Sequence, residues 1–350
     1  DPTSAFSRSS AGRELTAAGR GGFAMVERMS RTPGSPANNE LKAATVAANG
    51  WAAEMTAADA NYQPGKFTTF VAYEWTATAG YGTHMHRNVI FNADHGPAPF
   101  TAVQSDRPED LWKYLESVRR QGIDVLAIPH NANLSDGHDF DWNRSDGRPI
   151  DEAYALERAL NEPLVEIAQT KGDSETTPQL SPNDEFANFE IMDRIYKGES
   201  QTHWRGSYVR EAYGRGLVIQ SKVRVNPFKM GVVGASDIHN GLTNSDENAY
   251  AGEVSGLDPM TMTPHGEAAK LALGMVSNRA TRRPTGQKEN DPLQFSGAAI
   301  TGVWAEENTR ASIFAALKRK ETFATSGTRL KIRMFGGWGY DRQMLAHSDW

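Results

Sequence analysis

The chain has 350 residues, of which 39% are hydrophobic and 23% are charged, and its formal net charge at pH 7 is −6. Such a composition is typical of a globular protein with a large core. The acidic balance argues against a broad phosphate-binding surface, so nucleic acid is not an expected partner. No run approaches the roughly 18 apolar residues that cross a bilayer, and no membrane span is expected. The absence of cysteine excludes disulfides, thiolate catalysis and Cys-based zinc sites.

The first 60 residues are predicted to form a lid or helical entry segment ahead of a main domain at residues 61–350. Residues 1–36 are rich in Gly, Ser, Arg and Pro, whereas residues 38–60 are Ala-rich with an apolar side that predicts a helix. Gly50 is expected to interrupt this helix.

Two strands are predicted next. Aromatic and β-branched residues favour a strand at residues 67–74. A Gly-rich loop then ends at His84 and His86, and a short strand is expected at residues 88–91.

The clearest helix signal spans residues 105–121. Asp106 is a candidate cap, Pro108 suits the first turn, and Gly122 follows the basic end. A strand at residues 123–128 comes directly afterwards. Because strand, helix and strand alternate here, the sequence predicts a parallel sheet.

The rest of the chain continues the alternation of helices and strands. Helices are expected at residues 151–160, 184–196, 206–215, 264–278 and 309–321. Strands are expected at residues 163–168, 216–222, 231–237 and 298–305. The polar loop 131–149 is long enough to predict a functional or mobile segment.

Potential metal ligands lie at or near the ends of several predicted strands. Glu74, His130 and Asp237 each end such a run, and Glu166 lies within another. In barrels of parallel strands, residues at the carboxyl ends of different strands converge on one face. Carboxylates and imidazoles without cysteine suit a hydrolytic site that holds divalent metals.

Two His-containing patterns each have an ordinary alternative. Asp237 and His239 leave their strand on the same side because side chains alternate with period two, but such a pair also occurs in a turn capped by Asp with His on the surface. His84 and His86 can share a face of an extended segment, or supply one ligand and one bystander.

The order of these ligands resembles the PHP superfamily, named for polymerase and histidinol phosphatase. The stretches YEW, THMHRNVIF, IPHN, VEIAQTKGDSE, GASDIHNG, GVWAEENTR and ETFATSGTR more narrowly resemble the bacterial domain-of-unknown-function family 3604, over roughly residues 60–345. The resemblance implies an α/β fold, a distorted TIM-like (β/α)7 barrel with a metal cluster at the carboxyl ends of its strands.

The resemblance also implies a role for each candidate ligand. Glu74 matches the Glu that bridges two metals, and His86 and His130 match the imidazoles that complete one of those sites. Asp237 and His239 match a final Asp-x-His that serves the other metals. The implied cofactors are one to three divalent ions, Zn, Mn or Fe.

Two features depart from the superfamily pattern or match it less closely. Glu166 lies where the family has a Glu after its middle strand, and it remains a further candidate ligand. PHP proteins open with a strand that ends in His-x-His, and no histidine precedes Glu74. We therefore expect an N- and C-terminally incomplete member that lacks the first strands of the barrel.

The function that follows is a metal-dependent hydrolase, a phosphoesterase in which metal-bound hydroxide attacks a small anionic phosphate ester. Asp237 and Glu74 are the expected catalytic residues. The candidates for substrate binding are Arg87, His84, Lys171, Arg210 and Lys229. Two alternatives remain, namely hydrolysis of another ester or an amide at the same site, and a non-catalytic barrel that has lost part of its cluster. The family resemblance slightly favours a periplasmic or secreted protein, and the sequence indicates no oligomeric state.

Overall fold

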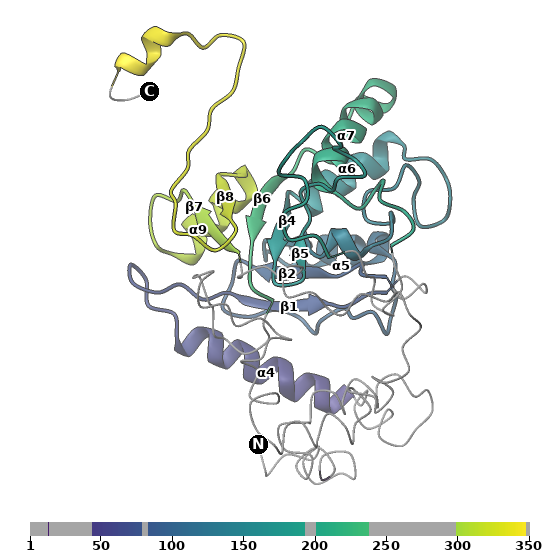
Figure 1. Ribbon diagram of the computed structural model, residues 1–350. Coiled ribbons are helices and arrows are strands. Elements are labelled where there is room, and N and C mark those ends of the chain that lie inside the picture. The colour runs from purple at the N-terminus through teal and green to yellow at the C-terminus, as the bar shows by residue number, and fades with distance from the viewer. Residues whose placement is uncertain (1–12, 14–43, 79–82, 193–200, 238–298, 348–350) are drawn as a thin grey trace, which may run out of the picture.

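The computed structural model describes residues 13, 44–78, 83–192, 201–237 and 299–347 (Figure 1). These residues form a mixed α/β structure with three small sheets, in the strand orders β1-β2-β3, β5-β4-β6 and β7-β8. The expected α/β class is therefore confirmed, and the strands of the described ranges do not close into a barrel. The predicted helix at 264–278, His239 and the segment 1–36 apart from Arg13 lie outside the described residues.

The first sheet contains β1 (Val71–Trp75), β2 (Arg87–Phe91) and β3 (Val125–Pro129). Both pairs are antiparallel, so the predicted parallel arrangement around helix α5 (Pro108–Arg120) is wrong. The reason lies in the segment between β2 and α5.

The end of β2 lies beside the start of β3, where the amide of Asn92 donates to the carbonyl of Asp124 at 2.9 Å. The start of α5 lies at the other end of the sheet, where Glu109 accepts from the amide of Ser145 in the loop after β3. The chain therefore returns along the sheet between Asn92 and α5. This extra pass makes the neighbouring strands β2 and β3 antiparallel.

The second sheet contains β4 (Leu164–Gln169), β5 (Gly172–Asp173) and β6 (Gly231–Gly234). Strands β4 and β6 are parallel, as expected for strands joined through helices. Helix α7 (Val209–Val223) lies in the connection between them and includes the predicted strand at residues 216–222.

That strand prediction is wrong because a short apolar run does not reveal its period. Ala212 and Ile219 are buried in the core, whereas Leu217 and Val218 are exposed, which is a helical pattern of burial. A Cβ at Gly216 would overlap the side chain of Asn226, so a larger residue here would require Asn226 to move.

Other predicted elements are confirmed with small changes in their ends. These are α4 (Ala44–Ala60), α6 (Glu152–Asn161), β7 (Ile300–Val303) and α9 (Arg310–Arg319). Strand β8 (Thr322–Thr325) follows α9 and pairs with β7. Short 3-10 helices, η2 (Ala132–Leu134) and η6 (Arg342–Ala346), complete the assignment. Helix α4 continues through Gly50, α5 begins after Arg107 rather than Asp106, and residues 184–192 form turns instead of a helix.

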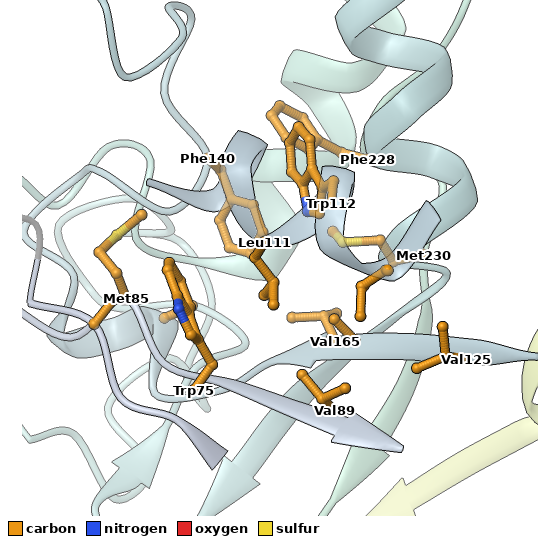
Figure 2. Packing of buried hydrophobic residues seen from close by; sticks show 14 of the residues in the cluster. Trp75, Met85, Val89, Leu111, Trp112, Val125, Phe140, Val165, Phe228 and Met230 are labelled. Atoms are coloured by element: carbon orange, nitrogen blue, oxygen red, sulfur yellow. The ribbon is translucent and has the colours of Figure 1, made fainter. Parts of the chain in front are cut away.

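The main core lies between the first two sheets and the helices that cover them (Figure 2). The strands contribute Trp75, Val89, Val125 and Val165, and these residues face Leu111 and Trp112 of α5, Phe140 of the long loop and Phe228. Helix α4 joins the same core through Trp51, whose ring packs on Tyr73 and Phe91. Within the described ranges, no helix is long and apolar enough to cross a membrane.

A half-buried carboxyl group in β5 predicts a pH-dependent stability. Burial raises the pKa of Asp173 to about 7, although its side chain accepts a hydrogen bond from the amide of Glu175 at 2.8 Å. Since the pKa is raised in the folded state, this group stabilises the fold at low pH, and the contribution is lost as pH rises from about 4 to about 7.

We expect wild-type protein to lose more stability than Asp173→Asn between pH 4.5 and pH 8, measured by urea denaturation. The asparagine keeps an acceptor for Glu175 but has no charge to bury. Equal losses in the two proteins would contradict the assignment.

Candidate metal centre

Three potential ligands meet where the strands of the first sheet begin or end. Because β1 and β3 both run antiparallel to β2, the ends of β1 and β3 lie beside the start of β2, in the register Trp75, Arg87 and Pro129. Glu74 is the next-to-last residue of β1, His86 precedes β2 and His130 follows β3. The antiparallel direction of β2 is therefore what brings His86 to the same edge as the other two.

The cluster is centred on the carboxylate of Glu74. Its Oε1 lies 2.7 Å from Nδ1 of His86 and 3.3 Å from Nε2 of His130. One ligand atom from each of the three residues lies within 4.8 Å of the others, which is close enough for a shared metal ion. Both imidazoles are buried, whereas the Glu74 side chain is 26% exposed, so the cluster is partly open to solvent at Glu74.

Main-chain hydrogen bonds fix the two histidines. The amide of His130 donates to the carbonyl of His86 at 3.2 Å, and the amide of His84 donates to the carbonyl of Leu134 at 3.1 Å. Asn131 then turns the chain with a left-handed φ of 55°. The ring of His84 lies against His86, with centroids 4.5 Å apart, so His84 forms the wall of the cluster.

Burial and the neighbouring carboxylates together shift the pKa values of the imidazoles. It lowers the pKa of His84 and of His86 below the ordinary value, in His86 despite the bond to Glu74. Burial alone would also lower the pKa of His130, but the hydrogen bond with Glu74 and the charge of Glu166 outweigh it and raise the pKa. His84 and His86 are thus held neutral, the form in which an imidazole binds a metal.

Unpaired polar atoms leave donors at the cluster that could hold a metal ion. Nε2 of His86 and Nδ1 of His130 are buried without a hydrogen-bond partner among the described residues, as is Oε1 of Glu166. Such groups are costly to bury unless they bind something. Two imidazoles and carboxylates are a donor set for Zn, Mn or Fe.

Asp237 and Glu166 lie next to this cluster, on the second sheet. Asp237 follows β6 in a left-handed conformation, with φ 56°. Its Oδ2 accepts from Nε2 of Gln169 at 2.9 Å and from Nδ2 of Asn131 at 3.4 Å, and it forms an ion pair with Nζ of Lys171. Burial raises the pKa of Glu166 to about 7.

Two of the predicted substrate-binding residues lie at the cluster, and three do not. His84 and Lys171 lie beside it. Arg87 is fully buried, and its guanidinium donates to Asp139 and Glu162. It is therefore not exposed for contact with a substrate.

Arg210 and Lys229 have other surroundings. Arg210 binds the carboxylates of Glu175 and Asp184 at 2.5 and 2.6 Å on the surface. Lys229 is exposed and precedes β6, at the opposite end of that strand from Asp237. Both residues were chosen for their positive charge, and charge alone does not determine where a side chain lies.

Sequence reasoning did not identify Asn131 and Gln169, the amides that hold Asp237. Asn131 directly follows the candidate ligand His130, and this position was the one sequence feature that could have indicated a role at the site. Gln169 ends β4, which shifts register between Glu166 and Ala168, and it contacts Asp237 just beyond the end of β6; no sequence pattern indicates this contact.

The chain matches the family model described as "Protein of unknown function (DUF3604)" over residues 7–350. A search of curated proteins found no match, and a search of solved structures found none either. Because the family model covers nearly the whole sequence, the chain belongs to the DUF3604 family of proteins of unknown function.

Proposed function

We propose that this chain is a metal-dependent phosphoesterase with a metal centre of the PHP superfamily type. The observation that carries the proposal is the cluster of Glu74, His86 and His130, whose ligand atoms lie within 4.8 Å of one another. The three residues come from three strand ends and are held by main-chain hydrogen bonds, so the group is prearranged rather than a chance surface contact.

Each residue has a part in holding the metal. Glu74, His86 and His130 would bind one ion, and Asp237 with Glu166 beside it would contribute to a further ion. A bound divalent metal lowers the pKa of a coordinated water and neutralises charge on a substrate oxygen. The chain itself supplies the buried, preoriented ligands.

Charge near the cluster favours an anionic substrate. Lys171 carries a positive charge at the edge of the site, and its side chain is 22% exposed. This lysine pairs with Asp237 and so reduces the repulsion that a phosphate ester would meet among the carboxylates.

Activity against matched aryl esters tests the proposal. Protein stripped with a chelator and reloaded separately with Zn²⁺, Mn²⁺ or Fe²⁺ would be assayed on aryl phosphate, aryl sulfate and aryl acetate. We expect turnover of the phosphate that disappears with the chelator and returns with metal. Turnover that the chelator does not reduce would contradict a metal-dependent reaction. Turnover of only the aryl sulfate or the aryl acetate would contradict the choice of a phosphate ester.

Metal content separates this proposal from a non-catalytic domain. Elemental analysis of purified protein is expected to give at least one divalent ion per chain. Less than one ion per chain after loading, together with no hydrolysis, would favour a binding or structural role.

A further inference from the structure

Arg87 directly follows the candidate ligand His86, and its side chain is completely buried. The guanidinium makes contacts with three acceptors. Nη1 donates to the carbonyl of Met85 at 2.7 Å, Nη2 to Oδ1 of Asp139 at 2.6 Å and Nε to Oε1 of Glu162 at 3.1 Å. A guanidinium offers five donors in a rigid fork, so three contacts in fixed directions hold it in one position.

The contact to Met85 acts on the main chain next to His86. The carbonyl of Met85 and the amide of His86 belong to the same peptide unit, and that unit is planar. By holding this carbonyl, Arg87 fixes the orientation of the peptide plane before His86. This in turn restricts the backbone position from which the imidazole side chain extends. The carbonyl of His86 is held in turn by the amide of His130.

The other two contacts tie down the segments that carry neighbouring ligands. Asp139 belongs to the loop that follows His130, and Glu162 lies four positions before Glu166 at the end of α6. Arg87 therefore connects three chain segments, each of which carries or adjoins a candidate ligand.

A second arginine completes the charge balance of this network. Nη2 of Arg158 lies 3.1 Å from Oε2 of Glu162 and 3.9 Å from Oδ1 of Asp139. Nε1 of Trp112 donates to Oε1 of Glu162 at 2.9 Å. Two arginines and two carboxylates are buried together, so the charges within this network balance.

We propose that Arg87 is a positioning residue of the metal centre, which holds His86 in its ligating orientation by clamping the Met85 carbonyl to Asp139 and Glu162. This inference rests on the proposed metal centre and assigns Arg87 a role different from the substrate contact predicted from sequence. Residues that orient a metal ligand typically contribute about 10- to 100-fold to metal affinity.

Arg310 provides a matched control at a distance from the ligands. It is also a buried arginine with several acceptors, since it donates to the carbonyls of Ala58 and Thr69 and to Asp59. Those partners belong to the end of α4 and to the segment before β1, whereas Glu74 lies near the end of β1. Loss of either arginine's contacts costs stability, but only Arg87 contacts the segment of His86.

The experiment compares wild-type protein with Arg87→Lys and Arg310→Lys. Each protein would be titrated with Co²⁺ while the dissociation constant and the visible absorption bands are recorded, and its melting temperature would be measured without metal. We expect both variants to melt at lower temperature, and only Arg87→Lys to bind Co²⁺ about tenfold or more weakly with altered bands.

Three results would separate the possibilities. If Arg87→Lys binds Co²⁺ with the affinity and bands of wild type, the positioning role is wrong while the metal centre stands. If wild type itself binds no Co²⁺, the metal centre is wrong and the positioning role falls with it. If Arg87→Lys does not fold, Asp139→Asn replaces it, because this change weakens one contact of Arg87. Asp139→Asn is also expected to weaken Co²⁺ binding. Unchanged Co²⁺ binding by that variant overturns the inference.

Discussion

Glu74→Gln and His130→Ala are each expected to lose bound metal and to reduce turnover of an aryl phosphate to background. Glu74 contacts both imidazoles, so glutamine removes the negative charge at the centre of the cluster while it keeps the shape of the side chain. His130→Ala removes one of the buried donors. The measurements are elemental analysis after metal loading and an ester assay with Mn²⁺ and Zn²⁺.

His95→Ala is the control for these changes, because His95 is an exposed histidine that contacts Asp94 on the surface. It is expected to keep wild-type metal content and turnover. Normal metal content in Glu74→Gln and His130→Ala would contradict the assignment of the cluster, even if turnover were lost.

Glu162→Gln is expected to lower the free energy of unfolding by about 3–5 kcal/mol, because it removes one charge from a buried network and leaves the other charges unbalanced. Burial by itself would raise the pKa of Glu162, but the charges of Arg87 and Arg158 outweigh it and hold the pKa below its usual range. A loss of this size is a large share of the stability of a typical domain. Urea denaturation followed by tryptophan fluorescence measures it.

Glu152→Gln is the matched control, since Glu152 is an exposed glutamate in the first turn of the same helix. Its favourable interaction with the helix dipole is worth about 0.3–1 kcal/mol. Equal midpoints for Glu162→Gln and Glu152→Gln would show that the buried network contributes little to stability.

The sequence predicted the members of the cluster but not the way they meet. Glu74 and His130 were identified because each ends a strand-like run, and His86 because it precedes one. In the predicted parallel sheet, the start of β2, and with it His86, would have lain at the opposite end of the sheet from Glu74 and His130. The antiparallel pairing depends on the path of residues 92–107, and no local pattern indicates that path.

The role of Arg87 could not be predicted from sequence. Its partners Asp139 and Glu162 lie 52 and 75 positions further along the chain, and none of the three belongs to a shared motif. A cation next to a candidate ligand resembles a substrate-binding residue until its burial is known. The opposite problem affected residues 216–222, where an apolar run predicted a strand and tertiary packing made it part of α7.

The most direct test of the metal centre is the anomalous difference density of a crystal soaked with Zn²⁺ and measured at the zinc absorption edge. The account predicts a peak in contact with Glu74, His86 and His130. A fully loaded crystal with no peak at these three side chains, or with peaks only at surface residues, would contradict it.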